Sequence, residues 1–165
     1  MSGIVEGALI ALFLGCSATD LTRGKIYNAY LFPFLVTGLL FHGYMTGAAG
    51  FNSSVMAIGL AFALFYPLWT LRVVAAGDAK LLMAAAAWAG PAGSVKLAAA
   101  SIVAGAIVGL PLAIARRAGI KDMERGTLPE GEATRLRKGT RAPFAPACLV
   151  AFLVLRIAEL QGWRL

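Results

Sequence analysis

Six apolar segments, each close to the length that crosses a bilayer, dominate this chain. They cover about residues 4–19, 29–46, 53–71, 79–93, 95–115 and 144–161. A helix needs roughly 20 apolar residues to span a membrane. Charged residues make up only 14% of the chain, whereas soluble domains carry about a quarter. The sequence therefore predicts an all-α fold: a polytopic bundle of six transmembrane helices, forming one integral-membrane domain over residues 1–165.

The basic residues predict the orientation of these helices. Arg23 and Lys25 follow the first segment, Arg72 and Lys80 flank the connection after the third, and eight more lie in the loop 116–142. Cytoplasmic loops carry an excess of Lys and Arg. Six spans place all three basic connections on the cytoplasmic side, with both termini on the extracytoplasmic side. Five spans would place the last basic loop opposite the other two.

Two aspartates lie at the ends of apolar segments. An acid close to the bilayer is costly and is a functional-site hypothesis by default. Asp20 ends the first segment and Asp78 begins the fourth, so the six-span topology places both at the cytoplasmic face. Two facing carboxylates cannot both ionise cheaply, and such a pair can supply a general acid and a general base. Each aspartate could instead form a local ion pair, Asp20 with Arg23 or Asp78 with Lys80.

Other kinds of site find little support in the sequence. Cys16 and Cys148 form no C-x-x-C pair, so neither zinc nor another metal is expected, and no disulfide is suggested. His42 is the single histidine and is expected to be structural. The basic loop 116–142 lacks the interleaved aromatic residues of a nucleic-acid interface, so its expected neighbour is a bilayer with anionic headgroups.

The patterns around the aspartates resemble the prepilin peptidases, membrane aspartic proteases of the GxGD type, and above all their short branch that serves Flp pili in tight-adherence systems. In that family the first Asp closes a helix and precedes a basic stretch ending Ile-Pro-Asn. The second Asp lies in a Gly-x-Gly-Asp-x-Lys-Leu-Leu segment. The matching residues here are Asp20, Ile26 and Asn28, then Gly77, Asp78, Lys80, Leu81 and Leu82. Tyr27 and Ala75 replace the proline and the first glycine.

The resemblance implies a multi-pass enzyme of the bacterial inner membrane, an aspartic endopeptidase that removes the leader of type IV, Flp-like prepilins at the cytoplasmic face. Its implied catalytic residues are Asp20 and Asp78, with Gly77, Lys80 and Asn28 supporting the site, and no metal or cofactor. The implied substrate has a short basic leader, a glycine at the cut and an apolar helix. We expect the resting aspartates to lie too far apart for a direct hydrogen bond and to close on the substrate.

Two other functions remain open from the sequence. Ala75, in place of the motif glycine, fits a catalytically inactive relative that binds pilin helices as a membrane assembly factor. The two acids would also fit a small transporter subunit that relays protons or cations. Conservative Asp→Asn changes separate these alternatives, because a peptidase loses its function with either change and a scaffold tolerates both.

Overall fold

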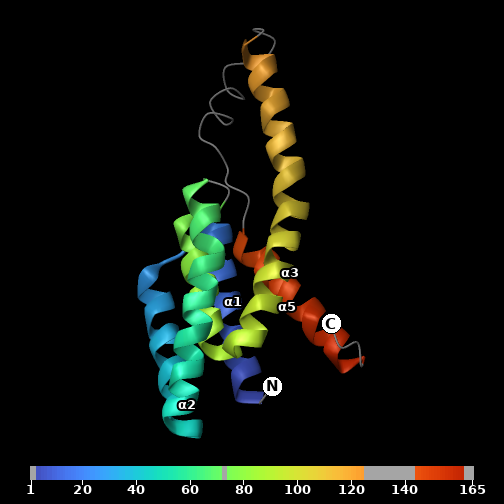
Figure 1. Cartoon of the computed structure of the whole chain (residues 1–165). Helices are drawn as coiled ribbons and strands as arrows, with labels where there is room; N and C mark the ends of the chain where they lie inside the picture. The colour runs from blue at the N-terminus through green and yellow to red at the C-terminus, as the bar shows by residue number, and fades with distance from the viewer. Residues whose placement is uncertain (1–2, 72–73, 125–143, 162–165) are drawn as a thin grey trace.

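The computed structural model describes residues 3–71, 74–124 and 144–161, and the regular secondary structure among these residues is α-helix (Figure 1). The helices are α1 (Gly3–Arg23), α2 (Asn28–Thr70), α3 (Ala76–Glu124) and α5 (Phe144–Leu160). Three described stretches are long and apolar enough to cross a membrane, namely α1, α2 and α3 as far as Pro111. The expected all-α fold with membrane-length helices is therefore confirmed at this level.

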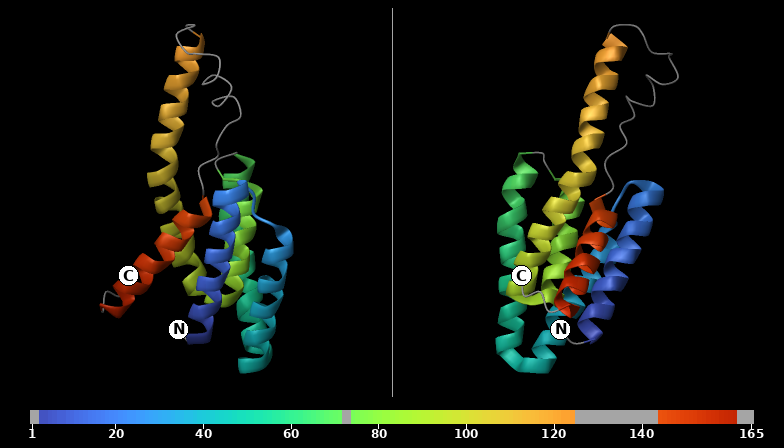
Figure 2. Two further views of the ribbon diagram at one scale, coloured as in Figure 1. Left: turned by 180° about the vertical axis from the view of Figure 1, so that it is seen from behind. Right: turned by 90° about the vertical axis from the view of Figure 1, so that its right-hand side faces the viewer.

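Two of these helices reverse direction at a single glycine. Gly47 in α2 has φ 66° and ψ −149°, and Gly90 in α3 has φ 71° and ψ 177°. Such backbone angles are open almost exclusively to glycine. Each helix therefore consists of two limbs that run in opposite directions (Figure 2). Pro91 follows Gly90 and begins the next limb, where its missing N–H costs nothing.

These reversals change the predicted segment boundaries. The sequence analysis left residues 47–52 and 94 between apolar segments, but these residues are helical apart from Gly47 itself. The described chain thus has six helical limbs: α1, the two limbs of α2, the two limbs of α3, and α5. Successive limbs run alternately up and down (Figure 1).

The second limb of α3 is longer than the sequence analysis predicted. The basic loop was placed at residues 116–142, but α3 continues to Glu124 and projects beyond the rest of the bundle (Figure 1). Residues 112–124 include Ala, Leu, Arg, Lys, Met and Glu, which favour helix even where the apolar run has ended. The rest of the predicted loop, 125–142, lies outside the described residues.

The first limb of α3 forms the centre of the bundle. Its Ala84–Ala87 run is at most 1% exposed, and Leu81 and Leu82 are 0% and 2% exposed. Small side chains let membrane helices approach closely. The largest side chains packed in this core include Phe13 of α1 and Phe65 of α2. The two leucines of the second motif therefore serve packing.

Side chains of α2 contact the last carbonyl groups of this limb. Ser54 Oγ donates to the Ala87 carbonyl at 3.0 Å, and His42 Nε2 lies 3.1 Å from the Trp88 carbonyl oxygen. The last four carbonyls of a helix have no intrahelical partner. These contacts stabilise the end of the limb just before Gly90 and give His42 the structural role that was expected.

Candidate active site

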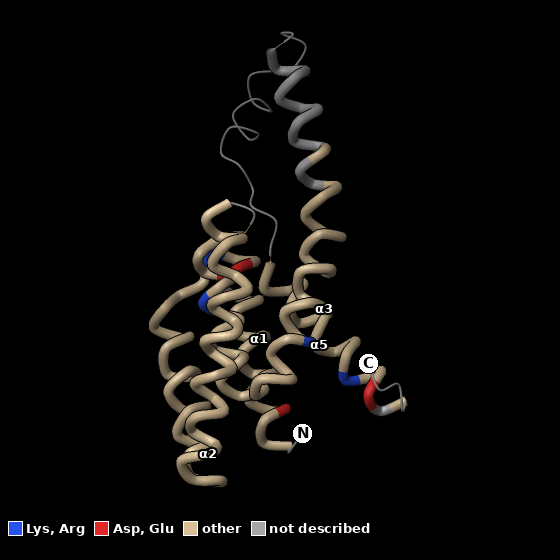
Figure 3. The backbone as a smooth tube through the Cα atoms, viewed as in Figure 1, with Lys and Arg blue, Asp and Glu red and all other residues tan. Residues whose placement is uncertain are grey.

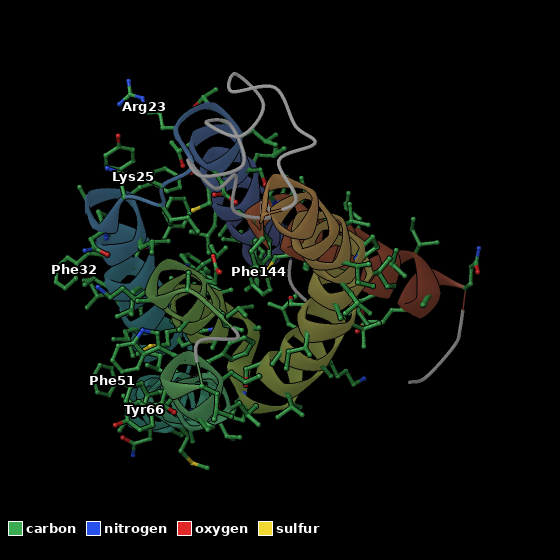
Figure 4. The ribbon with its side chains drawn as sticks, turned by 90° about the horizontal axis from the view of Figure 1, so that it is seen from above. Arg23, Lys25, Phe32, Phe51, Tyr66 and Phe144 are labelled. Atoms are coloured by element: carbon green, nitrogen blue, oxygen red, sulfur yellow. The ribbon has the colours of Figure 1, made fainter. Side chains whose placement is uncertain are left out.

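Several helix termini meet at one end of the bundle. The end of α1 and the beginnings of α2, α3 and α5 all lie there (Figures 1 and 2). Acidic and basic positions stand together at this end of the bundle (Figure 3). Viewed from above this end, Arg23 and Lys25 point outward while Phe144 lies among the helices (Figure 4). The polar groups of α1, α3 and α5 are therefore available to one site.

Asp20 connects α1 with α5. It is half-buried in the last turn of α1, and its Oδ2 accepts the backbone N–H of Ala145 at 3.2 Å. Ala145 is 0% exposed in the first turn of α5, where backbone N–H groups have no partner within their own helix. A carboxylate at a helix N-terminus is stabilised by about 0.3–1 kcal/mol, and more when partly buried.

Asp78 makes a similar contact at the start of α3. It is the third residue of that helix, and its Oδ2 accepts the backbone N–H of Ala75 at 3.2 Å. A side chain that reaches back to the residue before its helix supplies one half of a capping box. Both aspartates thus stand at helix N-termini, each with a backbone N–H directed at its carboxylate.

Cys148 of α5 lies near both aspartates. This residue of α5 is 0% exposed, and its thiol lies within electrostatic range of Asp20, Asp78 and Cys16. Sequence reasoning did not place either cysteine near the aspartates. A signal was present for Cys16, because it precedes Asp20 by four residues, a spacing that shares a helix face; no local pattern links Cys148 with either aspartate.

The three predicted supporting residues bring the two sequence patterns into contact. Lys80 Nζ donates to Asn28 Oδ1 at 3.3 Å. A Cβ atom on Gly77 would stand 3.4 Å from Ile26 Cβ, so Gly77 lets the start of α3 pack closely on the connection between α1 and α2. Ile26 and Asn28 belong to the first pattern, and Gly77 and Lys80 to the second, so these contacts hold the starts of α2 and α3 together.

The two positions that depart from the family pattern both precede helices. Tyr27 precedes α2, and its hydroxyl accepts Arg23 Nη1 at 3.0 Å. Ala75 precedes α3 and offers its backbone N–H to Asp78. This contact uses the main chain, which alanine and glycine have in common. The replacement of glycine by Ala75 therefore leaves the contact to Asp78 in place.

No group of three or more His, Cys, Asp or Glu side chains is placed to hold a metal ion within the described ranges. The backbone N–H groups of Ala145 and Ala75 contact the two carboxylates. Carboxylates held in this way can accept and release protons, which is the chemistry of general acid–base catalysis.

The described chain contains helices that are long enough to span a membrane, and two carboxylates lie at one end of the bundle. These features place the chain among helical membrane proteins that carry a polar site at one end. Residues 7–110, more than half of the chain, match the model of the Type IV leader peptidase family, and the chain belongs to this family. No curated protein and no solved structure matches the chain. The matched range includes both aspartates and the whole of α2, so family membership indicates a leader-peptidase-type protease.

Proposed function

We propose that the protein is a membrane-embedded aspartic endopeptidase that removes the leader of type IV, Flp-like prepilins. Asp20 and Asp78 are its catalytic pair. The observation that carries this proposal is their common location: α1 and α3 bring the two carboxylates to one end of the bundle, where Asp20 accepts the N–H of Ala145 and Asp78 accepts that of Ala75. Membership of the Type IV leader peptidase family supports the same assignment.

The proposed setting is the bacterial inner membrane, crossed six times, with the site at the cytoplasmic face and both termini on the other side. The limbs of α2 and α3, which alternate in direction, supply the membrane crossings that come between those of α1 and α5 in the chain. Arg23, Lys25 and Lys80 belong to the end that holds the aspartates, and cytoplasmic connections are enriched in such residues. The site would then stand at the depth where a leader meets an apolar pilin helix.

The proposed reaction needs one ionised and one protonated carboxylate. The ionised aspartate takes a proton from water as the water oxygen forms a bond to the scissile carbonyl carbon. The protonated aspartate donates a hydrogen bond to the carbonyl oxygen, which becomes negatively charged. When the C–N bond breaks, a proton passes to the leaving amine, and the pair returns to its original protonation state. Helix N–H groups at Ala145 and Ala75 hold the two carboxylates for these steps.

Co-expression with a candidate Flp-type prepilin tests this function. Leader removal would be scored by gel shift for the wild type, Asp20→Asn and Asp78→Asn, with Glu159→Gln as an acidic control distant from the site. Equal membrane levels of all four proteins would be required. Cleavage by the wild type and Glu159→Gln, with none by either aspartate variant, supports the peptidase.

Other outcomes of this experiment point to other functions. Pilus assembly that survives both aspartate changes would favour the assembly factor. If the wild-type protein is folded but leaves the prepilin uncut, the variant Ala75→Gly would be tested next. Cleavage restored by that change alone would identify Ala75 as the cause of the inactivity. If no candidate prepilin is cut by either protein, the peptidase proposal fails.

A further inference from the structure

A groove lies between the first limbs of α2 and α3, and neither Asp20 nor Asp78 is among its described lining residues. Its volume is about 180 Å³, and its described lining residues are Asn28, Leu31, Phe32, Leu35, Lys80 and Met83. The four residues of α2 follow the i, i+3, i+4, i+7 spacing of a single helix face. The groove is therefore a shared surface of two helices that continues for about two turns.

The groove has a polar end and an apolar body. Lys80 and Asn28 form the polar end, where Nζ donates to Oδ1 at 3.3 Å. Both side chains are exposed. The ammonium group has three donors and the Asn28 amide two more, so donors remain after their mutual bond. Beyond them the described lining is entirely apolar, with Phe32 69% exposed.

Lys80 is the charged residue among the described residues that line the groove. None of the described residues that line the groove is acidic. The exposed Arg23 and Lys25 stand in and beside the connection that leads into Asn28, and Arg23, Lys25 and Phe32 lie along one outer edge of the bundle (Figure 4). The first backbone N–H groups of α2 point to the same end, and Tyr27 places no side-chain cap on them.

The geometry points to a binding site for one anionic phospholipid in this groove. Its phosphate would accept hydrogen bonds from Lys80 Nζ and the Asn28 amide, and one acyl chain would lie along Leu31, Leu35 and Met83. Charge complementarity selects this occupant, since a phosphate matches the donors while an acyl chain matches the apolar lining. Basic residues near a membrane surface attract anionic lipid by about 1 kcal/mol each. The inference does not depend on the proposed peptidase activity.

Native mass spectrometry of the full-length protein tests the site. The protein would be released from mixed micelles with equal phosphatidylglycerol and phosphatidylcholine. Lys80→Met removes the ammonium group and keeps an apolar side chain of similar length. Lys96→Met is the matched control, because Lys96 is an exposed lysine of α3 outside this groove. Leu35→Trp fills the apolar body without altering charge, and thermal unfolding confirms that each variant is folded.

We expect the wild type and Lys96→Met to retain one phosphatidylglycerol in preference to phosphatidylcholine. The preference should fall about fivefold in Lys80→Met, as one surface cation implies, and Leu35→Trp should lose the bound lipid altogether. Equal retention of both lipids by the wild type would overturn the assignment. An unchanged preference in folded Lys80→Met, or bound lipid persisting in folded Leu35→Trp, would overturn it as well.

Discussion

The carboxylate of Asp20 accepts the backbone N–H of Ala145, so the last turn of α1 caps the first turn of α5. This contact joins residues 125 positions apart in the chain. It fixes the direction of a carboxylate to which we assign catalysis, and it does so through the main chain. The entry of α5 into the bundle and the orientation of Asp20 are therefore coupled.

Removing that N–H should lower the cleavage rate without unfolding the protein. Proline at position 145 lacks the N–H, and the first turn of a helix tolerates proline. Hydrogen bonds to charged groups contribute about 1.5–3 kcal/mol. We expect Ala145→Pro to reduce kcat at least tenfold with little change in KM, measured on a purified prepilin. Ala145→Gly keeps the N–H and should retain most of the rate. A folded proline variant with wild-type kcat would show that the contact does not position Asp20.

The two reversals of the helices should each depend on glycine. At Gly47 and Gly90 an added Cβ would meet nothing within 4 Å, but both residues have positive φ. Alanine there should cost about 1–3 kcal/mol of unfolding free energy from backbone conformation alone. The control is Gly59→Ala, at a helical position with equally open space, which should be neutral or stabilising. Denaturant unfolding in micelles measures all three. Equal stability of the three variants would contradict the positive-φ reversals.

An ion pair joins α1 and α5 toward the opposite end from Asp20. Arg156 Nη2 lies 2.5 Å from Glu6 Oε1, with side chains 19% and 27% exposed, and Arg156 also pairs with Glu159 one turn along α5. Glu6→Gln should lower the unfolding free energy by about 1–2 kcal/mol, and Glu159→Gln by less because the Glu159 side chain is 41% exposed. A double-mutant cycle with Arg156→Met isolates the pairwise energy. A coupling of zero between Glu6 and Arg156 would remove this pair from the stabilising contacts.

The sequence predicted the parts of this fold that arise from local pattern. Apolar run length predicted the helices, and the placement of Asp20 and Asp78 at run ends predicted their common end of the bundle. It predicted a connection over residues 47–52 where the chain reverses at Gly47 alone, because the apolar pattern does not show that one glycine can make the whole turn. The predicted end of the last limb of α3 was also too early, because residues with high helix propensity continue beyond the end of the apolar run.

Contacts between distant residues escaped the sequence analysis for a different reason. The Arg156–Glu159 ion pair could be predicted from the sequence, because the two residues share a helix face. The contact between Arg156 and Glu6 could not be predicted, because no local pattern links α1 with α5. The Ala145 N–H carries no side-chain signature at all. Conversely, the Ile26–Gly77 and Asn28–Lys80 contacts join residues that were each singled out, although only the fold shows that they touch.

The most direct test of the catalytic pair is a cleavage assay with purified components. Wild type, Asp20→Asn, Asp78→Asn and Glu159→Gln would be mixed with a purified Flp-type prepilin in anionic lipid micelles, and both products would be identified by mass. Our account predicts one cut between leader and pilin by the wild type and Glu159→Gln. It predicts a loss of at least a hundredfold in kcat for each aspartate variant, as removal of a general acid or base implies. Cleavage at an undiminished rate by either folded aspartate variant would contradict it.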